Sequence, residues 1–266
     1  MTRYSKWLLF TLILLGYCCS AQDEKRAHAR DSLIAIAILN LDSNMVYVEG
    51  GTFKMGLPEN SDVEGGEVEK PQHTVNVNSF YMLKTPVTQA LWLSVMDSNT
   101  SVHKNCYTCP MENISFNDVQ QFIKLLNKMT GKHYRLPTEA EFEYAASEGK
   151  KSHGYKYSGS NTIDEVGWYG SNAGMHSHPV AQKKPNELGL YDMSGNIWEW
   201  CSDWFDDHYY KYSPADNPTG PPHGLKKTLR GGTWISLDEG CLVIARAGAE
   251  PWSKDKYVGF RLVREP

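Results

Sequence analysis

The part of the chain after residue 150 contains no apolar pattern long enough for a helix. Short apolar stretches alternate there with Gly, Pro, Asn and Ser, and neither repeats nor low-complexity tracts impose a regular architecture. The 266-residue chain nevertheless carries 8 Trp and 15 Tyr and is 41% hydrophobic, which excludes a disordered protein. Exposed loops seldom hold so many aromatic side chains, so these rings must pack the loops together. The sequence therefore predicts a single compact α+β domain with few short helices and strands and many ordered loops.

The charge balance is close to neutral. The chain has 27 Lys and Arg against 31 Asp and Glu, a formal charge of −4, and a pI of about 6.1. A nucleic-acid-binding domain would carry a basic face. We therefore expect no nucleic-acid partner.

Residues 1–21 have the pattern of a secretory signal peptide. Arg3 and Lys6 precede a short apolar run over 7–15, and Ala21 supplies a small residue at the predicted cleavage site. The apolar run is too short for a membrane anchor, which takes roughly 20 residues. The sequence therefore predicts export, either to the periplasm or to the medium.

Lipid attachment is the alternative for this segment. Cys18 and Cys19 stand at the end of the apolar run, where an outer-membrane lipoprotein carries its acylated cysteine. Bacterial lipid attachment favours a small residue directly before that cysteine, whereas Tyr17 precedes Cys18. Membrane association is expected only if the chain is lipid-anchored through one of these two cysteines.

Removal of the signal peptide leaves 4 of the 6 cysteines and a charge of −6, from 25 basic and 31 acidic residues. An even cysteine count in an exported chain favours disulfides over thiol chemistry. Cys106 and Cys109 form a Cys-x-x-Cys segment that Pro110 follows at once. A redox thiol needs a helix amino terminus, and a zinc site needs more ligands than the nearby pair His176 and His178. We expect a loop disulfide.

Residues 22–44 are charged and then briefly apolar, which indicates a leader helix or linker before a domain over 45–266. Alternating apolar residues predict strands, and capping residues ahead of apolar periodicity predict helices. The expected strands cover 45–48, 52–55 and 74–81, and the expected helices cover 89–96, 119–129 and 142–146. The predicted N-caps are Thr88, Ser115 and Thr138, the last two with an acidic residue three positions later.

Six segments of this domain carry distinctive motifs. In chain order they are MVYVEGGTFKMG (45–56), PVT (86–88), YRLPTEAEFEYA (134–145), NELGLYDMSGNIWEW (186–200), RGGTW (230–234) and GFR (259–261). Together they resemble the sulfatase-modifying-factor family, which contains the formylglycine-generating enzymes. The resemblance implies a compact variant of the C-type-lectin-like fold. It further implies a bacterial member that is not an oxidase, similar to envelope lipoproteins that support gliding motility and secretion.

The oxidases of this family use copper, held by two cysteines, and molecular oxygen to convert a substrate cysteine to an aldehyde. Two soft thiolates suit Cu(I). The matching positions here are Ser236 and Cys241, and a hard serine hydroxyl is a poor Cu(I) ligand. Trp198 and Thr233 keep the character of family site residues, whereas Leu237 replaces a polar or basic one. The resemblance therefore predicts the remnant of a catalytic site, without copper.

Cys201 directly follows a tryptophan of the family motif and could meet Cys241 in space. This pair would be another source of two thiols for copper. In an exported protein, a disulfide or a buried pair is expected before a metal site. A disulfide between them would contribute roughly 3–4 kcal/mol in the chain-entropy model.

The resemblance also implies a calcium site on the segment 192–199. The implied ligands are two carboxylates and two backbone carbonyls, those of Asp192 and Glu199 and those of Gly195 and Ile197. Hard oxygen donors on a tight turn suit Ca²⁺, so calcium is the expected cofactor. In the structural alternative, Asp192 caps a turn and Glu199 pairs with an arginine such as Arg246 or Arg261.

Three functions are consistent with these features. The first is an exported, calcium-stabilised binding or structural module of the bacterial cell envelope, whose partner is a protein, a peptide or a glycan. The second is an active formylglycine-generating oxidase that acts on a sulfatase cysteine. The third is a carbohydrate- or peptide-binding lectin-like protein, for which the fold alone is weak support.

Two structural features separate these functions. An open groove beside Ser236 and Cys241 would favour substrate or peptide binding, and a filled one would favour a scaffold. Glycan binding would need a surface cluster of aromatic rings, from Trp168, Tyr169, Trp204, Tyr209 and Tyr210.

Overall fold

The computed structural model describes residues 32, 36–63 and 66–266. The predicted signal peptide, with Cys18 and Cys19, lies outside the described residues, as does most of the predicted leader. Residues 36–39 are helical, and Leu41 is buried in the main hydrophobic core. Within the described ranges, no helix is long and apolar enough to cross a membrane.

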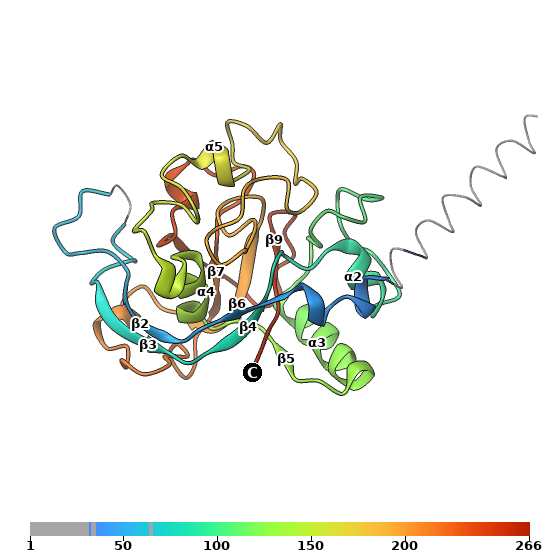
Figure 1. Cartoon of the computed structure of the whole chain (residues 1–266), viewed down its shortest axis with the longest axis horizontal. Helices are drawn as coiled ribbons and strands as arrows, with labels where there is room; N and C mark the ends of the chain where they lie inside the picture. Colours follow the sequence, from blue (N-terminus) through green and yellow to red (C-terminus); the bar gives the residue numbers. More distant parts are fainter. Residues whose placement is uncertain (1–31, 33–35, 64–65) are drawn as a thin grey trace, which may run out of the picture.

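Short strands and helices are separated by long loops throughout the domain (Figure 1). The strands are β1 (Met45–Val48), β2 (Gly51–Met55), β3 (His73–Val77), β4 (Phe80–Leu83), β5 (Tyr134–Arg135), β6 (Trp198–Phe205), β7 (Lys226–Arg230), β8 (Arg246–Ala249), β9 (Val258–Gly259) and β10 (Val263–Arg264). The α-helices are α2 (Gln89–Leu93), α3 (Phe116–Thr130), α4 (Glu139–Ala146) and α5 (Ile163–Val166). The predicted α+β domain with few short elements and a helix-poor second half is confirmed, since α5 has only 4 residues.

The strands form three small sheets. One has the order β1-β4-β10-β5, a second contains β2 and β3, and the third has the order β8-β7-β6-β9. All pairs are antiparallel except β6 with β9, which is parallel. The third sheet carries the site described below, because each of its four strands lines one groove.

The single strand predicted over 74–81 is wrong. The segment divides into β3, which pairs with β2, and β4, which pairs with β1. The break falls at Asn78 and Ser79, which form hydrogen bonds outside the strand pairing. The Asn78 amide donates to the Asn217 side chain over 2.7 Å. The Ser79 hydroxyl accepts from the Gly50 amide over 2.9 Å. The segment therefore pairs with two different strands, one on each side of this break.

The predicted helix starts are confirmed. The Thr88 side chain accepts from the Leu91 amide, and Ser115 and Thr138 each complete a capping box with the acidic residue three positions later. Helix α3 ends at Gly131, whose φ of 68° places it in the left-handed region that glycine adopts at low cost. Helix α2 ends three residues earlier than predicted, at Leu93.

Helix α4 is buried along its whole length and lies beside β6 and β7 (Figure 1). It carries two buried glutamates, and each pairs with a buried arginine: Glu143 with Arg230, and Glu139 with Arg246 over 2.6 and 2.8 Å. Buried charges need such partners. Arg230 ends β7 and also donates to three backbone carbonyls that follow Cys241, those of Val243, Ile244 and Ala245. The α4–β7 charge network therefore fixes the position of the loop that ends at Cys241.

Candidate functional site

The loop after β7 folds back on itself at two glycines. Gly231 and Gly232 have φ angles of 97° and 79°, a conformation that side chains with a Cβ rarely adopt. A Cβ on Gly232 would also lie 2.7 Å from the Cys241 sulfur. The glycine pair therefore allows the two ends of the loop, Thr233 and Cys241, to come into contact.

Ser236 and Cys241 are brought together, as the resemblance implied. The Ser236 hydroxyl accepts from the Thr233 amide over 3.1 Å, and both groups lie within hydrogen-bonding reach of the Cys241 thiol. Burial raises the pKa of Cys241 to about 12 despite these hydrogen bonds, so the thiol stays protonated at neutral pH. Thr233 is buried, and its hydroxyl donates to the Asn196 carbonyl over 3.3 Å.

These residues do not fit a copper ion. A site for Cu(I) needs two thiolates, and here one of the two positions holds a serine hydroxyl. The disulfide proposed between Cys201 and Cys241 is wrong, because both are free, buried thiols in different hydrophobic clusters. Cys201 packs on the β6 side against Met82 and Phe142 and therefore supplies no second thiol to the loop.

An open groove of about 500 Å³ borders Ser236. Its floor is the face of the third sheet, with side chains from all four strands: Trp198 and Trp200 of β6, Leu229 of β7, Ala249 of β8 and Val258 of β9. The sheet register explains this assembly, since Trp200 pairs with Leu229 and Leu229 with Ala247. Trp198 is partly exposed to the groove, as the resemblance placed it.

The walls of the groove combine apolar and charged side chains. Ile235 and Tyr257 line it together with the charged residues Lys226, Glu250 and Asp255. Ile235 is 41% exposed, and two large side chains beside the lining residues are more exposed still: Leu225 by 81% and Trp252 by 64%. Exposed apolar side chains gathered at a polar-rimmed groove are typical of a binding site.

The predicted calcium segment forms a tight turn before β6. Asp192, Gly195 and Asn196 all have positive φ angles, of 55°, 86° and 67°, which Asp, Asn and Gly tolerate best. The Asp192 carboxylate accepts from the Ala181 amide over 2.8 Å. Glu199 pairs with Arg261 through two bonds of 2.7 and 2.6 Å. The contacts expected without calcium, a turn capped by Asp192 and an ion pair of Glu199 with an arginine, are therefore present.

These residues nevertheless fit a hard cation. Asp192 and Glu199 are buried, and Arg261 bonds to the Glu199 carboxylate. The Asp192 carboxylate accepts only from the neutral amides of Ala181 and Asn196, so its charge has no bonded cationic partner among the described residues. Burial raises the pKa of both carboxyl groups. Across the described residues, no three His, Cys, Asp or Glu side chains are arranged to hold an ion. A calcium ion here would therefore have two carboxylate ligands, and the backbone carbonyls of Gly195 and Ile197 would supply the others.

The aromatic rings suggested for glycan binding do not form one surface. Tyr209 and Tyr210 are buried in the cluster beneath β2 and β3, at 5% and 2% exposure. Trp168 packs against Trp234, Tyr169 packs beside Cys241, and the ring of Trp204 is covered by the Lys227 ammonium at 3.8 Å. The requirement for lectin-like glycan binding is therefore not met.

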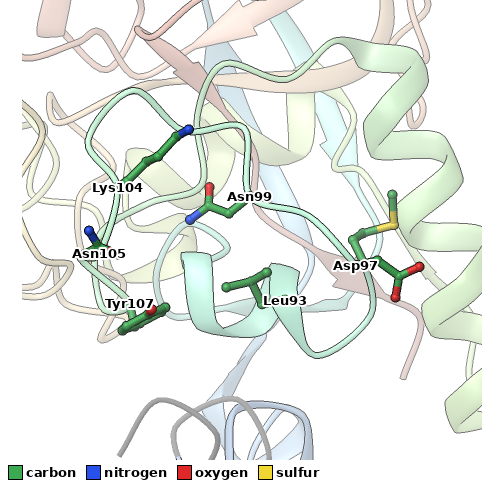
Figure 2. Close-up of a pocket in the computed structure, with 7 residues that line it drawn as sticks. Leu93, Asp97, Asn99, Lys104, Asn105 and Tyr107 are labelled. Carbon is green, nitrogen blue, oxygen red and sulfur yellow. The ribbon is translucent and has the colours of Figure 1, made fainter. Parts of the chain in front are cut away.

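The Cys106–Cys109 disulfide is present, as predicted. The carbonyls of Cys109 and Tyr107 accept from the first amides of α2, so the disulfide loop caps this helix. A cavity of about 440 Å³ lies between the loop and α2, with Asp97 and Lys104 on opposite sides (Figure 2). Both ends of the Asn99 amide in this cavity are already hydrogen-bonded within the protein.

Sequence reasoning missed most of the groove. Ile235 was predictable because it lies between Trp234, the last residue of a motif, and the site position Ser236. Gly248, Ala249 and Asp255 belong to no motif. The pairing of β8 with β7 brings the first two to the groove, and Asp255 lies in the loop before β9. An apolar residue directly after a motif was the one signal that the sequence offered.

Comparisons with known proteins agree with this geometry. The family model of the sulfatase-modifying factor enzyme 1-like domain matches residues 37–266. Chaperone protein LppX of Paenibacillus barcinonensis is 30% identical, over 87% of this chain and 89% of that protein. The formylglycine-generating enzyme of Streptomyces coelicolor is 36% identical, over 59% of this chain and 52% of the enzyme.

A solved structure extends the agreement to the fold. Treponema denticola variable protein 1 superposes with a TM-score of 0.75 at 29% identity, covering 84% of this chain and 95% of that one. The resemblance seen in six motifs thus spans the domain in sequence and in structure. This chain belongs to the sulfatase-modifying factor enzyme 1-like family.

Proposed function

We propose that this chain is a binding module that holds a peptide segment of a partner protein in the groove beside Ser236, and that it is not a copper oxidase. The observation that carries the proposal is an open groove next to a site that retains its loop geometry but has lost one of its two cysteines. Binding needs the groove alone, whereas oxidation needs both thiolates.

The lining chemistry suits a peptide. Trp200, Leu229 and Val258 give a buried apolar floor for a side chain, and Tyr257 and Trp198 give partly exposed aromatic walls. Charged groups at the rim, Glu250 and Lys226, provide polar contacts for a backbone or a charged side chain. A volume of about 500 Å³ accommodates a few side chains of a peptide.

The name of a relative supports a polypeptide partner. LppX, which matches this chain over most of both lengths, is described as a chaperone. A chaperone binds polypeptides through exposed apolar surface, and this groove offers such a surface at Ile235.

We also propose that the protein is exported and that calcium stabilises it. The Cys106–Cys109 disulfide supports an oxidising compartment, because disulfides are rare in the cytosol. The Asp192 carboxylate, which has no bonded cationic partner among the described residues, supports a bound cation. The partner would then be a protein of the cell envelope.

Substitution of one exposed side chain, Ile235, tests whether the groove binds peptides. Ile235→Asp places a charge in the groove wall, while Met129→Asp makes the same change on the exposed face of α3, at 56% exposure. Purified protein is used to select from a displayed library of random linear peptides, and the affinity of the selected peptides is measured. We expect Ile235→Asp to weaken binding at least about 10-fold and Met129→Asp to leave it unchanged.

Two outcomes would overturn peptide binding in this groove. One is a selection that enriches no peptide. The other is equal binding of the selected peptides by the wild-type protein and by Ile235→Asp. Thermal unfolding of each variant shows whether the fold is intact. We expect both variants to fold, because both substituted side chains are exposed in the wild-type protein.

A further inference from the structure

Strand β8 forms one edge of the third sheet, and among the described residues only its β7 side is paired. An unpaired strand edge presents backbone N–H and C=O groups to any extended chain that approaches it. The outer edge of β3 shows how such groups are covered: the Asn76 amide donates to the Ala215 carbonyl over 2.7 Å, and the Asn76 carbonyl accepts from the Asn217 amide over 2.8 Å. No described segment pairs in this way with β8.

The register of β8 identifies the backbone groups that point away from β7. Along an antiparallel pair, residues that bond to the neighbouring strand alternate with residues that face away from it. The Arg246 amide donates to the Glu69 carboxylate over 3.1 Å, so Arg246 faces away, and Ala247 bonds to its partner Leu229. Gly248 is the next residue in this alternation, so its N–H and C=O again point away from β7.

Gly248 therefore has an unused backbone donor and an unused acceptor. Among the described residues, no group outside the strand ladder bonds to either of them. The outward groups on both sides of it are occupied: Glu69 accepts from the Arg246 amide, and the Glu250 carbonyl accepts from the Ser253 amide. Gly248 is partly exposed and lines the groove of about 500 Å³. The sheet edge thus offers one backbone donor and acceptor at the margin of the groove.

The two faces of β8 are suited to a chain bound at this edge. Paired residues share a face, so Ala247 lies on the face of Leu229 and Trp200, which form the groove floor. Because alanine is small, the floor stays accessible from the sheet edge. On the opposite face, the Phe205 ring lies so close that a Cβ on Gly248 would be 2.6 Å from it. A bound chain would therefore direct side chains toward the open groove face.

We propose that the partner segment binds as an added β-strand, which pairs with the edge of β8 at Gly248 and places the side chains on either side of its paired residue in the groove. In strand addition, backbone hydrogen bonds give affinity and alternate side chains give specificity. The recognised class is an extended segment with apolar residues two positions apart. A helical segment does not fit, because its backbone groups are already bonded within the helix.

This inference rests on the proposed peptide binding, and its test starts from a selected peptide whose affinity Ile235→Asp weakens. Each backbone amide of that peptide is methylated in turn, and the affinity of every product for the full chain is measured. Methylation of the amide that donates to the Gly248 carbonyl removes this hydrogen bond. We expect that one product to bind at least about 10-fold more weakly, and the products methylated at the two adjacent amides to bind as the parent peptide does.

A second measurement follows the protein instead of the peptide. Hydrogen exchange of individual backbone amides is measured by NMR, with and without a saturating concentration of the parent peptide. Exchange of the Gly248 amide should slow at least about 10-fold on binding, because the added strand accepts a hydrogen bond from it. The control is the amide of Glu59, an exposed residue in the loop between β2 and β3, whose exchange should not change.

Two results would overturn strand addition and leave the proposed function in place. One is equal affinity of the parent peptide and all its methylated products. The other is unchanged exchange of the Gly248 amide in the saturated complex. In both cases the sensitivity of the parent peptide to Ile235→Asp still places it in the groove. A selection that enriches no peptide would overturn the proposed function and this inference together.

Discussion

At the scale of single residues, Ser236 makes structural contacts at a position where the resemblance implies a cysteine in the oxidases. Its hydroxyl accepts from the Thr233 amide and reaches the Cys241 thiol, so it closes the loop with ordinary hydrogen bonds. A hydroxyl is a better hydrogen-bonding group than a thiol and a far poorer ligand for a soft metal. The sequence predicted the contact between Ser236 and Cys241, because the two positions lie close together in one loop.

The buried carboxylates of Asp192 and Glu199 give a residue-scale prediction. If calcium neutralises their excess charge, a chelator should lower the melting temperature of the wild-type protein by about 5 °C or more, since a bound ligand stabilises by mass action. Asp192→Asn should have a melting temperature that the chelator no longer changes. Differential scanning calorimetry with and without chelator measures both.

The matched control for calcium is Asp97→Asn, at an exposed carboxylate far along the chain. This variant should respond to the chelator as the wild type does. A wild-type melting temperature that is the same with excess calcium and with chelator would contradict calcium stabilisation.

At the scale of secondary-structure elements, α4, β6 and β7 meet around buried charges. Arg230 and Arg246 neutralise Glu143 and Glu139, but Asp203 on β6 lies in the same region without an arginine of its own. Burial and then the charge of Glu139 raise the pKa of Asp203 to about 7. Its carboxylate accepts from the Glu139 amide over 3.1 Å, so the group is held at the start of α4.

This arrangement predicts a pH dependence of stability. The folded protein retains a proton on Asp203 up to about pH 7, whereas the unfolded chain releases it near 3.8. Because the folded state binds more protons in that interval, this residue's contribution to the free energy of unfolding falls as the pH rises from about 4 to about 7. Asp203→Asn should therefore gain stability over the wild type with rising pH, by about 2–4 kcal/mol above pH 7.

Urea unfolding of both proteins at several pH values measures this difference. Asn keeps an oxygen that accepts from the Glu139 amide, and the exposed control Asp207→Asn should show no such trend. A stability difference that stays constant from pH 4 to pH 8 would contradict a raised pKa for Asp203.

The sequence predicted helix starts correctly where the residues that determine them lie close together in the chain. The caps at Ser115 and Thr138 lie within four residues of the groups that they bind, so the start of each helix was readable. The division of 74–81 into β3 and β4 was not, because the Asn78 amide bonds to Asn217, which is remote in the sequence. The absence of a Cys201–Cys241 disulfide has the same origin, since tertiary packing assigns the two thiols to different clusters.

At the scale of the whole molecule, loops held by buried aromatic and ionic contacts surround three small sheets (Figure 1). The composition predicted this architecture, and the six motifs predicted the family. The groove could not be predicted, because its floor needs four strands in register and its rim uses Gly248 and Asp255, which belong to no motif. The chain has the fold of its family, and a serine stands at position 236, where the resemblance implies a cysteine in the oxidases.

The measurement that tests the central claim most directly is oxygen uptake with copper and a cysteine-containing sulfatase peptide. The wild-type chain is compared with Ser236→Cys, which restores the second thiol beside Cys241. We predict no copper-dependent oxygen uptake by the wild type. Any copper-dependent uptake should appear only in Ser236→Cys. Copper-dependent uptake by the wild type, with conversion of the peptide cysteine to an aldehyde, would contradict the account.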